Sequence, residues 1–322
     1  MKISLSRKEL ELRVNWKLSR NETLVKENFF ITIEDDGHIG IGEIAPNVRY
    51  GENSDVINKD YNKVKTYQFD SKIFSKQISL LDLSHSFSFG LESALVHLEA
   101  SRAGIPVHEY LNLSSPSEIS TSYSIPIMEE SELREYLKQI DRFEFIKIKV
   151  SRENAESFVK AIATLTDKPL RIDGNEAWDN LEDYLIFEKS VEHLNIQFIE
   201  QPMKSSMVEQ YKKLKPISKF EIMADESIES DVDMKLIAEQ FHSVNIKLMK
   251  ASGYFNAIKL LDEAKSFGLK TMIGCMIETS LGISSAINIG SLGDYFDLDG
   301  SLLIKNDPYD LIQESKGILK LN

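Results

Sequence analysis

Short apolar segments recur along much of this chain at a nearly constant spacing, and this repeat restricts the fold more than any other feature. They lie at residues 123–127, 145–150, 170–174, 197–200, 221–224, 244–248 and 271–274. Amphipathic helical stretches separate them, for example 155–165, 234–240 and 257–267. One strand and one helix repeat every 22–27 residues without a hairpin between strands, which predicts an α/β protein with a helix-covered parallel sheet. Seven such units and a short eighth segment near Asp297 favour a (β/α)₇β barrel, a modified TIM barrel, over an open sheet.

Residues 1–112 lack this repeat and predict a separate α+β domain. The segment 28–33 has strand character, 35–38 has turn residues and 39–43 predicts a return strand, which together indicate a β-hairpin. A helical pattern begins near residue 60 and is clearest at 89–100. The polar residues 114–117 predict a linker, so we expect the barrel to span residues 113–300. Residues 301–322 contain no further unit and are expected to pack back on the first domain and complete it.

Composition narrows the class of partner. The 322 residues carry a net charge of −13, which argues against nucleic acid or an anionic membrane as a partner. A single cysteine, Cys275, excludes an intrachain disulfide and a cysteine-based zinc cluster, and fits a reducing compartment. The N-terminal residues have no apolar targeting region, and no run approaches the ~18 apolar residues that span a bilayer. We therefore expect a cytoplasmic protein with no membrane partner; a homo-oligomer is compatible with the sequence.

Charged residues stand at the ends of five consecutive predicted strands. From Lys149 the series continues through Asp173, Glu200, Asp225 and Lys247, in steps of 24, 27, 25 and 22 residues. Each step corresponds to one strand–helix unit, so these side chains are expected at the carboxyl-terminal face, where barrel enzymes keep their active sites.

Three of these residues are carboxylates that would converge from neighbouring strands. Like charges this close repel one another unless a cation lies among them. Oxygen ligands without nearby cysteine or histidine favour Mg²⁺. For any one of Asp173, Glu200 and Asp225 the alternative is an ordinary acid at the barrel rim, but three at matched positions favour the metal site.

Two lysines within the strand 145–150 admit two interpretations. Because strand side chains alternate faces, Lys147 and Lys149 point opposite to Ile146 and Ile148, and the strand alone would suit a solvent-exposed face. With the acids one unit further on and Lys247 across the barrel, we expect both lysines to point into the barrel mouth instead. Two bases on opposite sides of a metal site could remove a proton from one face of a carbon and return one to the other.

These motifs resemble the enolase superfamily in its muconate-lactonising-type subgroup, over nearly the whole chain. The matching motifs are Lys147-x-Lys149, Asp173-x-Asn175, Glu200-Gln-Pro, Asp225-Glu-Ser and Lys247, preceded by Gly40-Ile-Gly-Glu43 and Pro46. The resemblance implies a capping domain before the barrel, metal ligands Asp173, Glu200 and Asp225, and acid/base residues Lys149 and Lys247. It also implies that Lys147 acts as an electrostatic partner of the substrate carboxylate. No histidine stands at a late strand end, which disfavours the mandelate racemase type.

Two further segments, 245–250 and 297–300, are similar to dipeptide epimerases, whose type member acts on L-Ala-D/L-Glu. That resemblance implies a Mg²⁺-dependent isomerase that inverts the α-carbon of the C-terminal residue of a dipeptide through a metal-stabilised enediolate. It implies that Asp297 and Asp299 bind the substrate ammonium, for which a solvated acidic turn is the alternative. Other implied substrate contacts are Ser124, Asn175, Cys275, Met276, Asn21 and Tyr50.

The capping loop departs from the type member. Asn21 falls where glutamate-handling relatives place an arginine, and this difference argues against Ala-Glu specificity. Arg20 is the adjacent residue. Val48, Arg49 and Tyr50 are expected on the other side of this lid. The alternatives for the whole chain are other enolate chemistry, such as o-succinylbenzoate synthesis or cycloisomerisation, and a non-catalytic barrel that binds a metal and a ligand. The substrates of that other enolate chemistry lack the ammonium that an Asp-x-Asp pair would bind.

Overall fold

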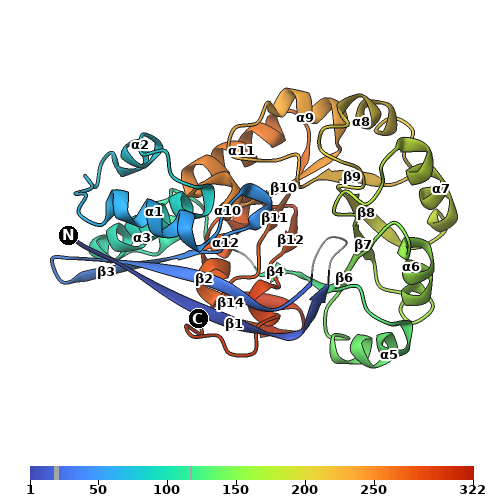
Figure 1. Cartoon of the computed structure of the whole chain (residues 1–322), viewed down its shortest axis with the longest axis horizontal. Coiled ribbons are helices and arrows are strands. Elements are labelled where there is room, and N and C mark those ends of the chain that lie inside the picture. The colour runs from blue at the N-terminus through green and yellow to red at the C-terminus, as the bar shows by residue number, and fades with distance from the viewer. Residues whose placement is uncertain (18–21, 117) are drawn as a thin grey trace.

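Eight parallel strands in the described part of the chain form one sheet that curls into a nearly closed barrel (Figure 1). The structure is a computed structural model that describes residues 1–17, 22–116 and 118–322. Neighbouring strands follow chain order: β5 (Ser122–Ile125), β6 (Phe145–Lys149), β7 (Leu170–Asp173), β8 (Ile196–Glu200), β9 (Glu221–Ala224), β10 (Ser243–Lys247), β11 (Lys270–Gly274) and β12 (Tyr295–Asp297). This order confirms the predicted modified TIM barrel.

Helices follow these strands and cover the outside of the barrel, as βα units require. They are α5 (Glu130–Gln139), α6 (Ala155–Ala163), α7 (Leu181–Val191), α8 (Val208–Leu214), α9 (Met234–Gln240), α10 (Leu248–Ala251), α11 (Tyr254–Ser266) and α12 (Ser280–Asn288), with the 3₁₀ turns η2 (Gly290–Leu292) and η3 (Gly300–Leu302). Their apolar faces pack on the outward side chains of the strands, such as Ile146 and Ile148, which are at most 1% exposed.

The inward side chains form two layers. Near the amino-terminal ends of the strands, Phe198, Met223 and Met272 pack together as a separate apolar cluster. Arg171 lies beside them with its guanidinium carbon 4.2 Å from the ring centroid of Phe145, a cation–π contact that accommodates its burial. Because strand side chains repeat every second residue, the next inward position on each strand lies at the carboxyl-terminal mouth.

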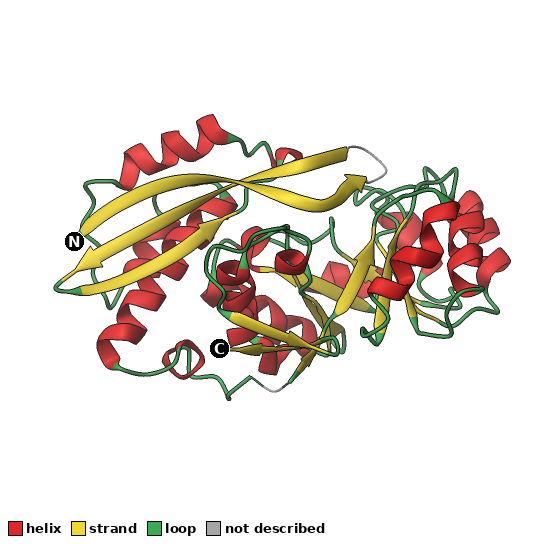
Figure 2. Cartoon of the chain, turned by 90° about the horizontal axis from the view of Figure 1, so that it is seen from below, coloured by secondary structure: helices red, strands yellow, loops and turns green. Residues whose placement is uncertain are grey.

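The N-terminal domain is an antiparallel sheet of β1 (Lys2–Lys17), β2 (Glu22–Asp35) and β3 (His38–Ile44). The hairpin predicted at 28–43 corresponds to β2 and β3. The long α3 (His85–Ala103) packs against β3, and the rest of the domain consists of η1 (Val48–Tyr50), α1 (Ser54–Val64), α2 (Phe74–Ser79) and α4 (Val107–Tyr110). Figure 2 shows the paired ends of β1 and β2 reaching across to the barrel.

The C-terminal segment touches both parts of the chain. The amide of Arg13 on β1 donates to the carbonyl of Leu303, and Lys305 donates to the carbonyl of Glu11, at 2.9 and 2.8 Å. Further on, β13 (Ile312–Ser315) and β14 (Ile318–Leu321) form a small sheet with β4 (Ile119–Ser120), which precedes the first barrel strand. Residues 303–321 thus lie against the N-terminal sheet and against the base of the barrel. None of the described helices is long and apolar enough to cross a membrane.

Candidate active site

Three buried carboxylates lie at the carboxyl ends of neighbouring strands. Asp173 ends β7, Glu200 ends β8, and Asp225 directly follows β9. Asp173 and Glu200 are paired in the β7–β8 register, and all three residues are at most 4% exposed. Parallel strands end at the same rim, so the fold itself brings these charges together.

The two lysines of β6 lie on the inward face beside these acids. Nζ of Lys147 is 2.7 Å from Oε2 of Glu200, 2.7 Å from Oδ2 of Asp297 and 3.1 Å from Oδ2 of Asp173. Lys149, one inward position nearer the mouth, donates to Oδ2 of Asp173 at 2.6 Å. The side chain of Lys147 is 1% exposed and that of Lys149 is 12% exposed, so neither belongs to a solvated face.

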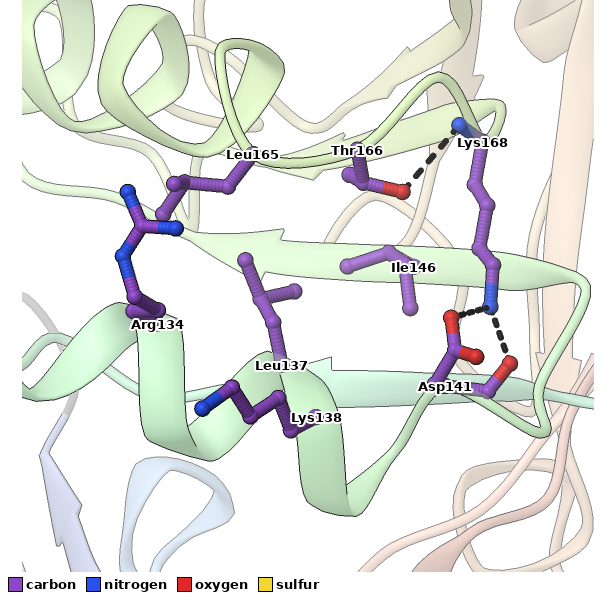
Figure 3. A pocket seen from close by; sticks show the side chains of 8 residues that line it. All are labelled: Arg134, Leu137, Lys138, Asp141, Ile146, Leu165, Thr166 and Lys168. Carbon is purple, nitrogen blue, oxygen red and sulfur yellow. Dashed lines mark hydrogen bonds and ion pairs between the residues drawn. The ribbon is translucent and has the colours of Figure 1, made fainter.

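The other face of β6 points away from the mouth. Figure 3 shows Ile146 in a hollow of about 240 Å³ on the outside of the barrel, beside Leu137 of α5. An ion pair between Lys168 and Asp141, 2.9 Å long, lies at one side of this hollow. The hollow is therefore separate from the acids and lysines of the mouth.

Lys247 ends β10 and faces the same space from the other side. Within the eight-stranded order of the described residues, β10 lies four strands from β6, which is halfway round the barrel. Its Nζ contacts Oδ2 of Asp225 at 2.9 Å. Lys149 and Lys247 therefore approach the mouth from opposite sides, each in contact with one carboxylate.

Asp297 and Asp299 lie where the first and last strands of the barrel meet. Oδ1 of Asp297 accepts from the hydroxyl of Ser122 at 2.7 Å, and its other oxygen contacts Lys147. Oδ2 of Asp299 accepts from the backbone amide of Ser124 at 2.7 Å. Both aspartates are at most 5% exposed, so they are not a solvated acidic turn.

The capping domain contributes η1 to the mouth. The phenol of Tyr50 lies close enough to Asp225 and Lys247 to be influenced by their charges, and burial raises its pKa far above the ordinary value, so the hydroxyl stays protonated. The side-chain amide of Asn47 lies 3.8 Å from Sδ of Met276. Asn21 and the adjacent Arg20 lie outside the described residues.

The remaining predicted contacts lie around the same rim. Nδ2 of Asn175 donates to Oε1 of Glu226 at 3.3 Å. The thiol of Cys275 donates to the carbonyl of Asp297 at 3.3 Å, and burial followed by the negative charges of Glu278 and Asp299 raises its pKa well above the ordinary value. A thiol held in that state is a poor nucleophile.

The family described as enolase C-terminal domain-like matches residues 130–295, more than half of the 322-residue chain. The chain belongs to the enolase superfamily. It is 33% identical to the L-Ala-D/L-amino acid epimerase of Pedosphaera parvula, over 99% of this chain and 95% of that protein. It is 29% identical to the L-Ala-D/L-Glu epimerase of Bacteroides thetaiotaomicron, over 100% of this chain and 86% of that protein.

Solved structures of the superfamily show the same architecture. The dipeptide epimerase of Cytophaga hutchinsonii, complexed with Mg and the dipeptide D-Ala-L-Val, superposes with a TM-score of 0.90 at 26% identity and covers 99% of this chain and 92% of that one. The substrate-liganded L-Ala-D/L-Glu epimerase of Bacillus subtilis gives a TM-score of 0.91 at 25% identity, over 100% and 97%. These likenesses confirm the resemblance to the enolase superfamily and its dipeptide epimerases.

In this enolase-superfamily site, sequence reasoning missed Lys250. It lies on α10, one turn after Lys247, and is 2% exposed. Its Nζ contacts Oδ1 of Asp225 at 2.7 Å and also donates to the main-chain carbonyl of that residue. A lysine between apolar residues directly after a strand is a signal that could have found it. The carboxylate of Glu226 was noted only as the neighbour of Asp225, yet it is 8% exposed and faces Asn175.

Negative charge exceeds positive charge at this mouth. Among the described residues, the carboxyl groups are those of Asp173, Glu200, Asp225, Glu226, Asp297 and Asp299, and the ammonium groups are those of Lys147, Lys149, Lys247 and Lys250. Burial, together with the charges of neighbouring acids, raises the pKa of Glu200, of Glu226 and of Asp299 to about 7 in each case. Burial also opposes ionisation of Asp173, but Lys147 and Lys149 lower its pKa to about 2.

Two of the lysines, Lys147 and Lys247, are held in their protonated forms. Burial alone would lower the pKa of Lys147, but the charges of Asp173, Asp297 and Glu200 outweigh it and raise the pKa well above the ordinary value. For Lys247 the charge of Asp225 likewise outweighs burial and raises the pKa. While carboxylates surround these two lysines, burial therefore does not depress the pKa of either one.

The residues present fit a hard divalent cation in their chemistry. Within the described residues, no group of three or more His, Cys, Asp and Glu side chains is arranged to hold a metal by itself; ammonium groups lie among the carboxylates. The donors are nevertheless all oxygens, the charge balance is negative, and the buried Oε2 of Glu226 and Oδ1 of Asn245 have no hydrogen-bond donor among the described residues. A cation beside these oxygens would balance the excess charge.

Proposed function

We propose that this protein is a Mg²⁺-dependent dipeptide epimerase that inverts the α-carbon of the C-terminal residue of a dipeptide. The observation that carries the proposal is the placement of Lys149 and Lys247 halfway round the barrel from each other, each within 2.9 Å of a carboxylate oxygen. Inversion at carbon needs a proton taken from one face and a proton returned to the other, and this pair faces the mouth from both sides.

In this proposal, one of the two lysines takes the α-proton of the bound dipeptide and the other donates a proton to the opposite face. Lys147, which is buried and protonated, provides positive charge for the substrate carboxylate. Asp297 and Asp299 receive the N-terminal ammonium, because two carboxylates on one buried rim form a cation site. Tyr50, whose hydroxyl stays protonated, lies close enough to Lys247 to be influenced by its charge.

The metal ligands in the proposal are Asp173, Glu200 and Asp225. Mg²⁺ held by these residues would supply positive charge for the substrate carboxylate and would weaken the attraction between the ligand carboxylates and the neighbouring lysines. The solved Cytophaga hutchinsonii complex with Mg and a dipeptide supports this assignment by family likeness.

For the substrate we propose dipeptides with L-alanine at the first position. The 33% identical relative is named an L-Ala-D/L-amino acid epimerase, and other relatives are named L-Ala-D/L-Glu and hydrophobic dipeptide epimerases. The second side chain is therefore the variable part, and a mixture of L-Ala-D/L-Xaa dipeptides is the first set to screen.

The test is incorporation of deuterium at the α-carbon of such dipeptides in D₂O with Mg²⁺, followed by mass spectrometry and chiral analysis. The wild-type protein is expected to exchange the α-proton and to convert one epimer into the other. Lys149→Ala and Lys247→Ala are each expected to abolish epimerisation, since each removes one of the two bases. Lys259→Ala, at an exposed position on α11, is the control and should keep wild-type turnover.

Wild-type turnover in either base variant would show that the two-base mechanism is wrong. Exchange limited to substrates without an ammonium group would instead favour other enolate chemistry, because Asp297 and Asp299 would then have no substrate cation to bind. We also propose a cytoplasmic location, which the single cysteine Cys275 supports. Light scattering would measure the assembly state.

A further inference from the structure

We propose that Arg49 and Glu176 form a latch that holds the capping-domain loop 47–52 on the barrel and thereby fixes the position of Tyr50, which follows Arg49 in the same turn. The inference rests on the proposed function for its kinetic consequence, but its structural content does not depend on catalysis. Arg49 and Glu176 are positioning residues here, acting through Tyr50.

The latch is a two-point contact between the domains. Nη1 of Arg49 donates to Oε2 of Glu176 and Nη2 donates to Oε1, both at 2.9 Å. This is the paired geometry in which a planar guanidinium matches a carboxylate, and it fixes orientation as well as distance. The side chain of Glu176 is 6% exposed and that of Arg49 is 29% exposed, so solvent screens the pair only in part.

The barrel side of the latch is held in place by its backbone. Glu176 has a φ of 63°, in the left-handed region that residues with a side chain seldom adopt. Its amide donates to the carbonyl of Gln201 at 2.8 Å, and its Oε1 also accepts from the amide of Ser205 at 2.8 Å. These bonds fix the carboxylate at one point of the rim, where it faces the capping loop.

Hydrogen bonds within the capping domain hold the two ends of loop 47–52. Oε2 of Glu52 accepts from the amide of Asn47, and Oε1 accepts from the amide of Ser86 at the start of α3. Within the loop, the amides of Gly51 and Glu52 donate to the carbonyls of Val48 and Asn47. The loop is thus tied to its own domain at its base and to the barrel through Arg49.

Tyr50 lies next to the latch residue in the same 3₁₀ turn. Arg49 docks on the loop after β7, so the turn that contains Tyr50 is held against this part of the barrel. The guanidinium of Arg49 already makes two hydrogen bonds to Glu176. Arg49 is therefore better suited to holding the loop in position than to binding an acidic substrate. Release of the pair would remove this two-point contact between the loop and the barrel.

Hydrogen exchange measured by mass spectrometry tests the latch without any substrate. Arg49→Gln and Glu176→Gln are expected to speed exchange of the amides of Gly51 and Glu52 about tenfold, since the closed loop loses its barrel contact. Arg49→Lys keeps the positive charge but cannot make the two parallel hydrogen bonds of a guanidinium, so an intermediate increase in the exchange rate is expected. Arg152→Gln is the matched control because Arg152 pairs with Asp179 and Asp183 on an exposed surface, and exchange in 47–52 should stay unchanged.

Kinetics with an active dipeptide test whether the latch acts through Tyr50. Each latch variant is expected to raise KM about tenfold, because the closed conformation of loop 47–52 is less populated and the apparent affinity for the dipeptide falls. We expect kcat to change less than twofold, because the complex that does close is unaltered. In a Tyr50→Ala background, the same latch changes should alter KM less than twofold.

Three outcomes separate the two proposals. Unchanged exchange in 47–52 for both latch variants would overturn the latch, whatever the enzyme does. Changes in KM that persist in full in the Tyr50→Ala background would overturn the action through Tyr50. Faster exchange in a protein that epimerises no dipeptide would support the latch and contradict the proposed function.

Discussion

A two-residue step along β6 gives its lysines different surroundings. Lys147 contacts three carboxylates and is 1% exposed, whereas Lys149, at the end of the strand, contacts Asp173 and keeps some contact with solvent. Strand periodicity predicts that both point inward. Which acids surround each one depends on how deep it lies in the barrel, and that depth follows from the register of neighbouring strands.

Glu92 is a residue whose environment no local pattern indicated. It lies inside α3, where its carboxylate accepts from the hydroxyl of Ser75 and from the amide of Phe255 in the first turn of α11. Burial raises its pKa to about 7. Helical periodicity would place an acid there on a solvated face, but α11 of the barrel packs over it.

This raised pKa predicts a pH-dependent contribution to stability. Because the pKa in the folded state lies above the unfolded value of 4.5, the contribution is complete below about pH 4.5 and declines as pH rises to about 7. Glu92→Gln cannot titrate, so the free energy of unfolding of the variant relative to wild type should rise by about 3 kcal/mol across that interval.

Urea unfolding at several pH values measures this difference, with Glu99→Gln as a control on the same helix. A difference between Glu92→Gln and wild type that stays flat from pH 4.5 to 7 would show that folding does not raise the pKa of Glu92.

At the scale of elements, strand positions followed from the sequence better than their ends did. The first barrel strand was expected to reach residue 127, but β5 ends at Ile125 because the following Pro126 has no amide hydrogen to donate to the ladder. The strand expected at 244–248 ends at Lys247, and the chain turns at once into α10. That early turn is what brings Lys250 back to Asp225. Helical structure begins at Ser54, earlier than expected, where Asn53 caps α1.

The packing of β3 on α3 depends on glycine. A Cβ at Gly42 would lie 1.9 Å from the carbonyl oxygen of Gly90 and 2.4 Å from Oγ of Ser93. The two elements approach so closely that no side chain fits between them. Gly40 and Gly42 thus both serve the contact of a strand with a helix.

Gly42→Ala is therefore expected to lower the free energy of unfolding by about 3 kcal/mol, because the added methyl group must displace backbone of α3. Chemical denaturation measures the loss. The control is Ile39→Ala on the same strand, whose side chain is 56% exposed and should change stability by less than about 0.5 kcal/mol. Equal stabilities of Gly42→Ala and Ile39→Ala would show that α3 shifts without cost.

At the scale of the whole molecule, buried carboxylates join the capping domain to the barrel. Glu43 of β3 accepts from the hydroxyl and amide of Thr279 and from the amide of Gly282, at the amino-terminal end of α12. A negative charge at that end of a helix is favoured because the free amides and the helix dipole point toward it. These contacts, like the ion pair of Arg49 with Glu176, join the N-terminal domain to the barrel.

Metal binding should appear as stability of the whole protein. If Mg²⁺ binds the folded chain through Asp173, Glu200 and Asp225, a concentration of 100 times Kd should raise the free energy of unfolding by about 2.7 kcal/mol. Asp225→Asn is expected to lose most of this increment, while Asp262→Asn on the exposed side of α11 should retain it.

Denaturant unfolding with Mg²⁺ or with EDTA, together with calorimetric titration of Mg²⁺, provides the measurement. An identical transition of the wild-type protein in both buffers, with no heat of binding, would contradict the metal assignment.

The sequence by itself determined the barrel, because each strand–helix unit carries its own periodicity, and it placed the acids and lysines at the strand ends because parallel strands share one rim. Only the tertiary structure decided the partners of those charges. Lys250 meets Asp225, Arg49 meets Glu176 and Glu92 meets α11 across segments far apart in the chain. No local pattern records such contacts, since they arise from how two domains and eight strands pack, and burial there sets the pKa values as well.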